Sequence, residues 1–317
     1  MPQVQITPPE VDEARISIIM DNSFDMLMAS TEVAKRFPLG PNAFEDTLPI
    51  AEHGFSALIR VVRGNKEGTV LFDTGLTRNG TLYNMDAMEI DISGIQAVIL
   101  SHGHIDHTTG LAGIINRKGV RNIPLVLHPD AYLERKVVFP NGNEIRLPAP
   151  KLKDLRHEGV EIIEEVNPSM LIDDMLLVSG EIPRSTEFEK GFPVHYAKRD
   201  DSWEPDPFIM DDQCAIANLR GKGLVIVTGC GHSGIINVIR NAQTLTGITT
   251  IYAVIGGFHL TGGLFERIIP DTIKALQEIN PRYIMPGHCT GWSAVHQIAR
   301  ALPEAFIPSS VGTTLIL

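Results

Sequence analysis

The 317-residue sequence is 43% hydrophobic and 21% charged, and its 27 Lys and Arg against 38 Asp and Glu give a formal net charge of −11. This composition supports a large buried core and excludes a disordered or fibrous chain. The acidic balance disfavours nucleic acid as a partner, because neutralising phosphates requires a basic face, although a local pocket can still bind a small anionic substrate.

Cysteine usage and the N-terminal segment indicate a cytoplasmic protein. Cys214, Cys230 and Cys289 are too few for a disulfide framework and favour a reducing compartment. Residues 1–15 are polar and lack the basic-then-apolar layout of a secretion signal. The longest apolar runs are far shorter than a bilayer span, so we expect a soluble chain without a membrane partner.

The first half of the chain predicts strands joined by turns. Apolar or β-branched stretches that stop at turn residues indicate strands at 14–20, 56–62, 69–72, 95–100 and 124–127. The second and third of these flank Gly64-Asn65 and predict a hairpin. Helices are expected at 85–90 and 108–117, the latter before the stop signal Gly119.

After a less regular middle segment, the second half of the chain again predicts strands and helices in alternation. The middle predicts a helix at 129–136, strands at 161–165 and 175–178, and a long polar loop or lid at 184–207. The second half predicts strands at 214–219, 224–228, 251–255 and 283–285, and helices at 234–244, 270–278 and 294–302. Two halves that each hold a hairpin followed by strand–helix units predict two packed sheets, and without a convincing linker we expect one domain, 1–317.

A cluster of metal-ligand residues follows the apolar strand at 95–100. Residues 101–107 read Ser-His-Gly-His-Ile-Asp-His. His102 and His104, two positions apart in an extended segment, point the same way and can chelate one ion. Asp106 and His107, after a further bend, can serve a second ion. Imidazole nitrogen with carboxylate oxygen suits Zn, Fe or Mn, whereas a merely His-rich surface loop would not follow a buried strand.

This run resembles the signature of the metallo-β-lactamase fold superfamily, and Asp73 in Phe-Asp-Thr-Gly resembles the aspartate motif that precedes it. The resemblance covers nearly the whole chain and implies an α/β fold, a four-layer αββα sandwich with metals between its halves. Within the superfamily the chain is similar to the dihydropterin-ribofuranosyl-aminobenzene-phosphate synthase-like group. The segments that carry this similarity are 51–56, 179–184, 228–232, 256–259 and 286–289.

The resemblance implies that the remaining ligands come from the second half. His288 in Pro-Gly-His matches the last histidine motif, whose histidine binds the second metal. His232 is our choice for the third ligand of the first metal. The superfamily usually places a bridging aspartate where this chain has Cys230, so Cys230 either binds as a thiolate or is a buried thiol.

Several other side chains have open roles. The superfamily's usual third histidine is replaced by Glu181, which is a candidate metal ligand, a substrate-binding group with its partner Arg184, or half of a surface ion pair. Asp73 is expected to orient a ligating histidine rather than bind metal. His53 and His259 are candidates for substrate binding or for support of the site. His128 is a weaker candidate, and His157, His195 and His296 are expected to be solvated without a role.

The ligand set predicts a metal-dependent hydrolase. Two divalent ions, Zn or alternatively Fe or Mn, would activate a water against an ester, lactone, amide or phosphoester, with Asp106 as the catalytic carboxylate. The alternatives are an iron-dependent redox enzyme and a non-catalytic metal- or ligand-binding protein on the same fold. The partner is a small-molecule substrate, and a homo-oligomer stays open. Loop aromatics would line the substrate pocket or anchor the loops: Phe24, Phe37, Phe44, Phe188, Phe192, Tyr196 and Trp203.

Overall fold

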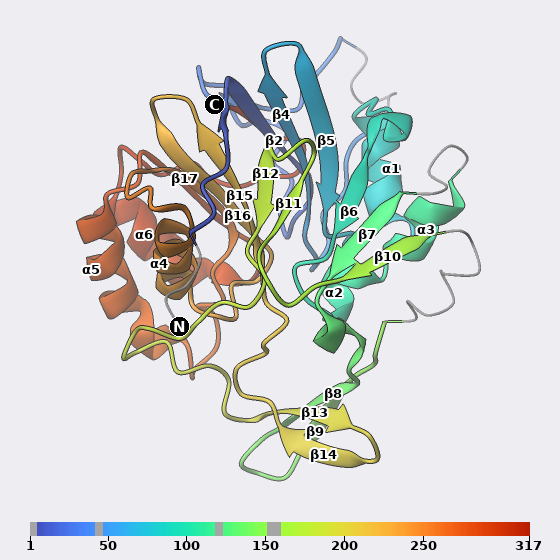
Figure 1. Cartoon of the computed structure of the whole chain (residues 1–317), viewed down its shortest axis with the longest axis vertical. Coiled ribbons are helices and arrows are strands. Elements are labelled where there is room, and N and C mark those ends of the chain that lie inside the picture. The colour runs from blue at the N-terminus through green and yellow to red at the C-terminus, as the bar shows by residue number, and fades with distance from the viewer. Residues whose placement is uncertain (1–4, 42–46, 118–122, 151–159) are drawn as a thin grey trace.

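The computed structural model describes residues 5–41, 47–117, 123–150 and 160–317. Two large sheets pack face to face in the middle of the molecule, and helices cover the outer face of each (Figure 1). The layers therefore run α–β–β–α, which confirms the predicted α/β sandwich. Gly119, Phe44 and His157 lie outside the described residues.

The first sheet has the strand order β10-β7-β6-β5-β4-β2-β19-β3. Its strands are β2 (Glu13–Met20), β3 (Ala34–Lys35), β4 (Ser56–Arg63), β5 (Lys66–Phe72), β6 (Ala97–Ile99), β7 (Pro124–Leu127), β10 (Glu161–Glu164) and β19 (Thr314–Ile316). Helices α1 (Gly80–Ala87) and α3 (Leu111–Asn116) pack on its outer face, where Met85, Leu111 and Ile114 meet Leu71 and Leu125 in one apolar cluster.

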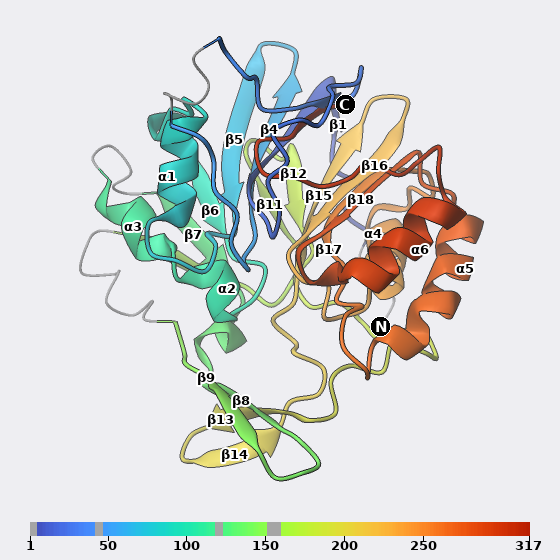
Figure 2. The same cartoon turned by 180° about the vertical axis from the view of Figure 1, so that it is seen from behind.

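The second sheet has the order β11-β12-β15-β16-β17-β18, and β1 pairs with β15. Its strands are β1 (Glu10–Val11), β11 (Ser169–Leu171), β12 (Leu176–Val178), β15 (Cys214–Leu219), β16 (Gly223–Thr228), β17 (Ile251–Gly257) and β18 (Tyr283–Gly287). Helices α4 (Ile235–Thr246), α5 (Ile269–Ile279) and α6 (Trp292–Ala301) cover its outer face, on the opposite side of the molecule from α1 and α3 (Figure 2). No helix in the described part of the chain is long and apolar enough to cross a membrane.

Alternation along the strands builds the core. In β16, Val225 and Val227 face the other sheet, whereas Leu224 and Ile226 face the helices. Both faces of these central strands are buried, so they read as continuous apolar runs. Strands β5, β6 and β7 are parallel, as are β16, β17 and β18, so each set directs its carboxyl ends toward one edge of its sheet.

The predicted helix at 85–90 was misplaced, and the predicted helix at 108–117 is interrupted near its start. The first helix is α1, and it cannot continue past residue 88 because Glu89 has a left-handed φ of 56°. The second is two short helices, α2 (Ile105–Thr108) and α3. Between them Gly110 lies against the backbone, where a Cβ would come within 1.9 Å of the carbonyl oxygen of Thr74.

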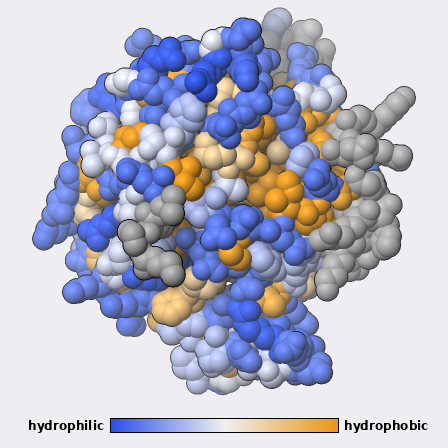
Figure 3. Space-filling view, viewed as in Figure 1, coloured by the Kyte–Doolittle hydropathy of each residue, from blue (hydrophilic) through white to orange (hydrophobic). Residues whose placement is uncertain are grey.

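The predicted helix at 129–136 was also wrong, and the predicted loop at 184–207 was wrong from residue 195 onward, although residues 184–194 are a loop. The former is a 3₁₀ turn (Pro129–Tyr132) followed by a strand, and much of the latter is a hairpin. Together they form a third sheet of order β14-β13-β8-β9, with β8 (Arg135–Val138), β9 (Glu144–Leu147), β13 (His195–Arg199) and β14 (Ser202–Pro205). This inserted sheet projects from the sandwich, and its surface is largely hydrophilic (Figure 3).

Candidate metal centre

The chemistry-bearing side chains follow the carboxyl ends of parallel strands from both large sheets. The chain leaves β6 into the His-Gly-His segment, residues 102–104, and α2 then presents Asp106 and His107. From the second sheet, Cys230 and His232 follow β16, and His259, His288 and Cys289 follow β17 and β18. Asp73, His259 and His288 have left-handed φ values of 58°, 43° and 47°. Such strained non-glycine positions persist where the surrounding structure enforces them, often at functional sites.

His102, His104 and His232 form the first donor group. One ring nitrogen of each histidine lies within 4.8 Å of those of the other two, and His104 Nδ1 is 3.1 Å from His232 Nε2. Burial and the neighbouring imidazoles hold the pKa of each of the three well below its usual value. These rings are therefore neutral and able to bind a cation.

The hydrogen bonds of Ser101 fix the orientation of His102. The Ser101 hydroxyl donates to Asp73 Oδ2 at 2.7 Å, so it accepts from His102 Nδ1, 2.9 Å away. The proton of His102 is then on Nδ1, and Nε2 carries a lone pair. Nε2 is buried and has no hydrogen-bond partner among the described residues, which fits a position facing a cation.

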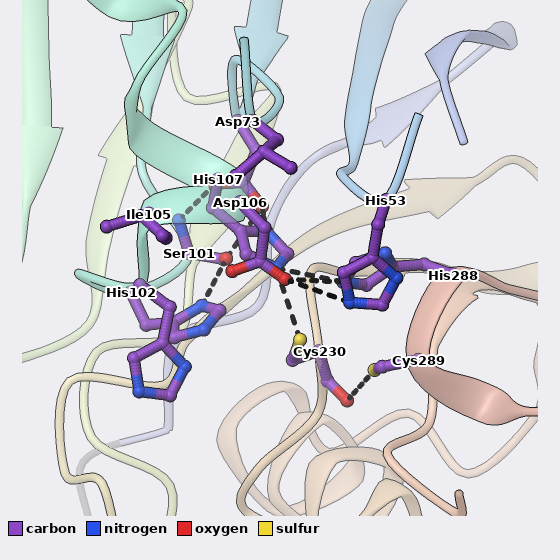
Figure 4. Close-up of polar contacts among 12 residues, drawn as sticks. His53, Asp73, Ser101, His102, Ile105, Asp106, His107, Cys230, His288 and Cys289 are labelled. Atoms are coloured by element: carbon purple, nitrogen blue, oxygen red, sulfur yellow. Dashed lines mark hydrogen bonds and ion pairs between the residues drawn. The ribbon is translucent and has the colours of Figure 1, made fainter. Parts of the chain in front are cut away.

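Asp106, His107, Cys230 and His288 form the second donor group (Figure 4). His107 Nε2 lies 3.1 Å from Cys230 Sγ and 3.2 Å from His288 Nε2, and His288 Nε2 lies 3.3 Å from Asp106 Oδ2. Burial alone would raise the pKa of Asp106, but His107 and His288 hold it well below its usual value. The group thus brings an ionised carboxylate, two imidazoles and a thiol close enough together to bind one cation.

Asp73 contacts His107 and belongs to no donor group among the described residues, and its role in orienting a metal ligand stays a prediction. Its Oδ2 is 2.7 Å from His107 Nδ1, and its Oδ1 accepts the backbone N–H of Ser101 at 2.7 Å. His107 therefore keeps its proton on Nδ1 and turns Nε2 toward the second group. A carboxylate behind a ligating imidazole is a common support of metal sites.

Cys230 and Cys289 are both buried beside the second group. Cys289 Sγ lies 3.4 Å from the carbonyl oxygen of Cys230, and the two thiols form a third close group with His259. Burial raises the pKa of the Cys230 thiol well above its usual value. Cys230 is therefore a thiol unless a soft cation displaces its proton.

His53 and His259 lie at the rim of the two donor groups, and their contact with a substrate stays a prediction. His53 is exposed, and its Nε2 lies 3.8 Å from Asp106 Oδ2. His259 is half-buried, and its ring centre lies 4.2 Å from that of His232. Both line a cavity of about 210 Å³ that also reaches His104 and Asp106.

Glu181 and Arg184 do not form the predicted pair. Glu181 Oε1 lies 3.1 Å from His128 Nε2, and neither Glu181 nor Arg184 belongs to a donor group among the described residues. Arg184 donates instead to the backbone carbonyls of Ile182 and Phe208. Glu181 is close enough in sequence to pair with Arg184, but the turn after β12 directs it toward His128.

His195 is the site residue that the sequence analysis missed. Expected to be solvated, it is fully buried, and its Nε2 lies 3.2 Å from His104 Nε2. The available signal was the turn pair Asp200-Asp201 between two stretches that alternate like strands, which predicts a hairpin in place of a loop. The exposed His296 on α6 is solvated, as predicted.

Comparisons with known proteins identify the family of this chain. Residues 51–288 match the model of the metallo-beta-lactamase superfamily. A relative from Methanocaldococcus jannaschii, 7,8-dihydropterin-6-methyl-4-(beta-D-ribofuranosyl)-aminobenzene-5'-phosphate synthase, is 34% identical over 265 residues, which cover 81% of this chain and 87% of the relative. An uncharacterised protein of the same organism is 35% identical over 272 residues, covering 83% and 92% of the two chains.

The fold also matches a solved structure. Tm1679, described as a metal-dependent hydrolase of the beta-lactamase superfamily, superposes with a TM-score of 0.72 at 23% identity, covering 95% of this chain and 98% of that one. This likeness confirms the fold, and the synthase relative confirms the subgroup resemblance. The family match over most of the sequence shows that the chain belongs to the metallo-β-lactamase superfamily.

Proposed function

We propose that this chain is a metal-dependent hydrolase that holds two divalent cations and cleaves an ester, lactone or phosphoester bond of a small molecule. One observation carries the proposal: within the first donor group, the neutral imidazoles of His104 and His232 face each other at 3.1 Å, and the second group adds the ionised carboxylate of Asp106. Two lone pairs at such a distance repel each other unless a proton or a cation lies between them. His102 Nε2, buried without a partner among the described residues, supports the same reading.

The first cation would be held by His102, His104 and His232, and the second by Asp106, His107 and His288. Zinc is favoured by this nitrogen-rich set, and iron and manganese also accept it. When bound, such cations supply Lewis acidity, which polarises a substrate oxygen and makes a water molecule acidic.

Two side chains of the cavity are placed to handle protons. Asp106 is ionised, so its carboxylate accepts a hydrogen bond from a water in the cavity and orients that water. His53 is exposed at the mouth, with Nε2 3.8 Å from Asp106 Oδ2, and can pass a proton to the leaving group. In this role Asp106 would be a catalytic residue, because its carboxylate would contact the water that reacts.

The cavities fit a small substrate with an anionic group. The cavity over Asp106 has a volume of about 210 Å³, and a neighbouring cavity of about 230 Å³ shares His232 and His259 with it. Phe258 and Phe265 line the neighbour together with Lys190 and Arg267. Although the chain is acidic as a whole, this cavity combines the positive side chains of Lys190 and Arg267 with apolar walls. Such a lining favours a substrate that carries a phosphate or carboxylate.

A substrate panel on metal-loaded protein tests the proposal. Protein supplemented with Zn²⁺, Mn²⁺ or Fe²⁺ is assayed on bis-p-nitrophenyl phosphate, an aryl ester and a lactone, beside Asp106→Asn and the control His296→Gln. We expect turnover of at least one substrate by the unchanged chain and His296→Gln, and none by Asp106→Asn. Equal turnover by Asp106→Asn, or none by any form, would contradict the proposal.

The 34% identity to a named synthase favours a second candidate, a reaction that joins two substrates at the same centre. Product analysis separates the two candidates. A hydrolase incorporates ¹⁸O from labelled water into its product, whereas a synthase yields a joined product and depends on both substrates.

A further inference from the structure

The inserted sheet reaches into the metal centre through one buried side chain. His195, the first residue of β13, is fully buried, and its Nδ1 lies 3.0 Å from the carbonyl oxygen of Asp206. The backbone N–H of Asp206 donates in turn to the carbonyl of His195 at 2.9 Å, so the hairpin register itself fixes this pair. The other ring nitrogen, Nε2, lies 3.2 Å from His104 Nε2.

These contacts determine where the protons of both rings lie. A backbone carbonyl can only accept, so Nδ1 of His195 carries the proton and its Nε2 has the lone pair. The hydrogen bond between the rings then requires a proton on Nε2 of His104. Nδ1 of His104 is left with its lone pair directed at the first donor group, 3.1 Å from His232 Nε2.

A second connection from the same sheet ends on the same segment. Arg135 of β8 is 1% exposed and binds both Asp206, at 3.3 Å, and Asp211, at 2.6 Å. Asp211 accepts the backbone N–H of Gly103 at 2.7 Å. Two buried paths from the inserted sheet therefore converge on the His102–His104 segment, one on a side chain and one on the backbone.

The polar network is one attachment of the sheet to the rest of the molecule. None of the described residues of its four strands belongs to the three hydrophobic clusters of the molecule. Removing one partner of a buried ion pair leaves the other charge buried and uncompensated, so such a network disfavours other arrangements. The network therefore sets the position of the sheet relative to the metal-binding segment.

We propose that His195 is a positioning residue that holds His104 in the tautomer and orientation needed to bind a cation through Nδ1. The inserted sheet is then part of the metal centre and not only a cover over the cavity. The inference rests on the proposed metal-dependent function. His195 itself belongs to no donor group among the described residues, so it acts through His104.

Two conservative variants separate this role from packing. The amide of His195→Gln reaches the place of Nε2 and can still accept from His104. The amide of His195→Asn reaches the place of Nδ1, so it keeps the bond to the Asp206 carbonyl and loses the contact with His104. Glu144→Gln, an exposed change on β9 of the same sheet, is the matched control.

The first measurement uses metal-free protein. Long-range ¹H–¹⁵N spectra of the imidazoles should show His104 protonated on Nε2 in the unchanged chain, in Glu144→Gln and in His195→Gln, and a mixture of tautomers in His195→Asn. His104 protonated on Nδ1 in the unchanged chain, or a spectrum of His195→Asn identical to it, would overturn the inference.

The second measurement is Zn²⁺ affinity by chelator competition, with circular dichroism to confirm folding. Loss of a group that supports a ligand weakens metal binding about 10- to 100-fold. We expect this loss at one of the two sites in His195→Asn, and affinity near that of the unchanged chain in His195→Gln and Glu144→Gln. Unaltered affinity in His195→Asn would overturn the positioning role alone, whereas an unchanged chain that binds no Zn²⁺ would overturn the proposed function.

Discussion

Replacing Asp73 with Asn tests the support behind the second donor group. The side chain is fully buried and accepts three hydrogen bonds at 2.7 Å, from the backbone and hydroxyl of Ser101 and from His107 Nδ1. An amide keeps one acceptor but presents an N–H toward His107. His107 then accepts at Nδ1 and carries its proton on Nε2, the atom that should face the cation. We expect metal affinity to fall about 10- to 100-fold.

The same substitution should also change how the free energy of unfolding of the metal-free protein depends on pH. Burial lowers the pKa of His107, but Asp73 and Asp106 outweigh it and raise that pKa to about 9. A pKa raised above the unfolded value of about 6.5 stabilises the fold fully below pH 6.5, and this contribution is lost as the pH rises toward 9. Its size is about 3 kcal/mol, and Asp73→Asn should remove much of it.

Urea unfolding of the metal-free protein between pH 6 and 9.5 measures this effect. The free energy of unfolding of the unchanged chain should fall across the range relative to that of Asp73→Asn. Asp86→Asn, which removes an exposed carboxylate paired with Arg117, controls for the lost charge and should follow the unchanged chain. Parallel curves for the unchanged chain and Asp73→Asn would refute the assigned coupling between Asp73 and His107.

Three further predictions concern the donor groups and the segment that carries them. Asp106→Ala should abolish hydrolysis while circular dichroism shows an unchanged fold, because the core strands do not need the carboxylate; retained activity would contradict the mechanism. Cys230→Ser should leave the metal content unchanged, because Asp106, His107 and His288 hold the second cation without sulfur; a lowered metal content by elemental analysis would place Cys230, whose Sγ lies 3.1 Å from His107 Nε2, among the ligands. Gly103→Ala should cost about 1–3 kcal/mol of stability by urea unfolding, because its Cβ would lie 2.2 Å from the carbonyl oxygen of Ala131; wild-type stability would show that the backbone yields freely.

The sequence predicted well the strands that form apolar runs and the grouping of the donor residues that follow strand ends. The apolar runs at 124–127 and 214–219 coincide with β7 and β15, and the donors that follow strands converge as expected. His102, His104 and His232 form one group, and Asp106, His107 and His288 lie together in the other, which also contains Cys230. Their binding of metal stays a prediction.

The sequence did not predict features of the structure that depend on contacts between residues far apart in the chain. His195 lies 91 positions from His104, and although the turn pair Asp200-Asp201 indicates a hairpin, no local pattern shows that His195 packs against His104. The polar composition of 184–207 favoured a loop because strands of a small sheet expose much of their surface and alternate weakly. Glu181 had several chemically reasonable partners, and only the tertiary structure selects His128.

Location of cations by anomalous scattering is the most direct test of the central claim that the two donor groups form a metal centre. Crystals of protein purified with Zn²⁺ should show two anomalous peaks, one among His102, His104 and His232 and the other among Asp106, His107 and His288, with elemental analysis giving about two metals per chain. Less than about one metal per chain, or a peak at neither group, would contradict the account.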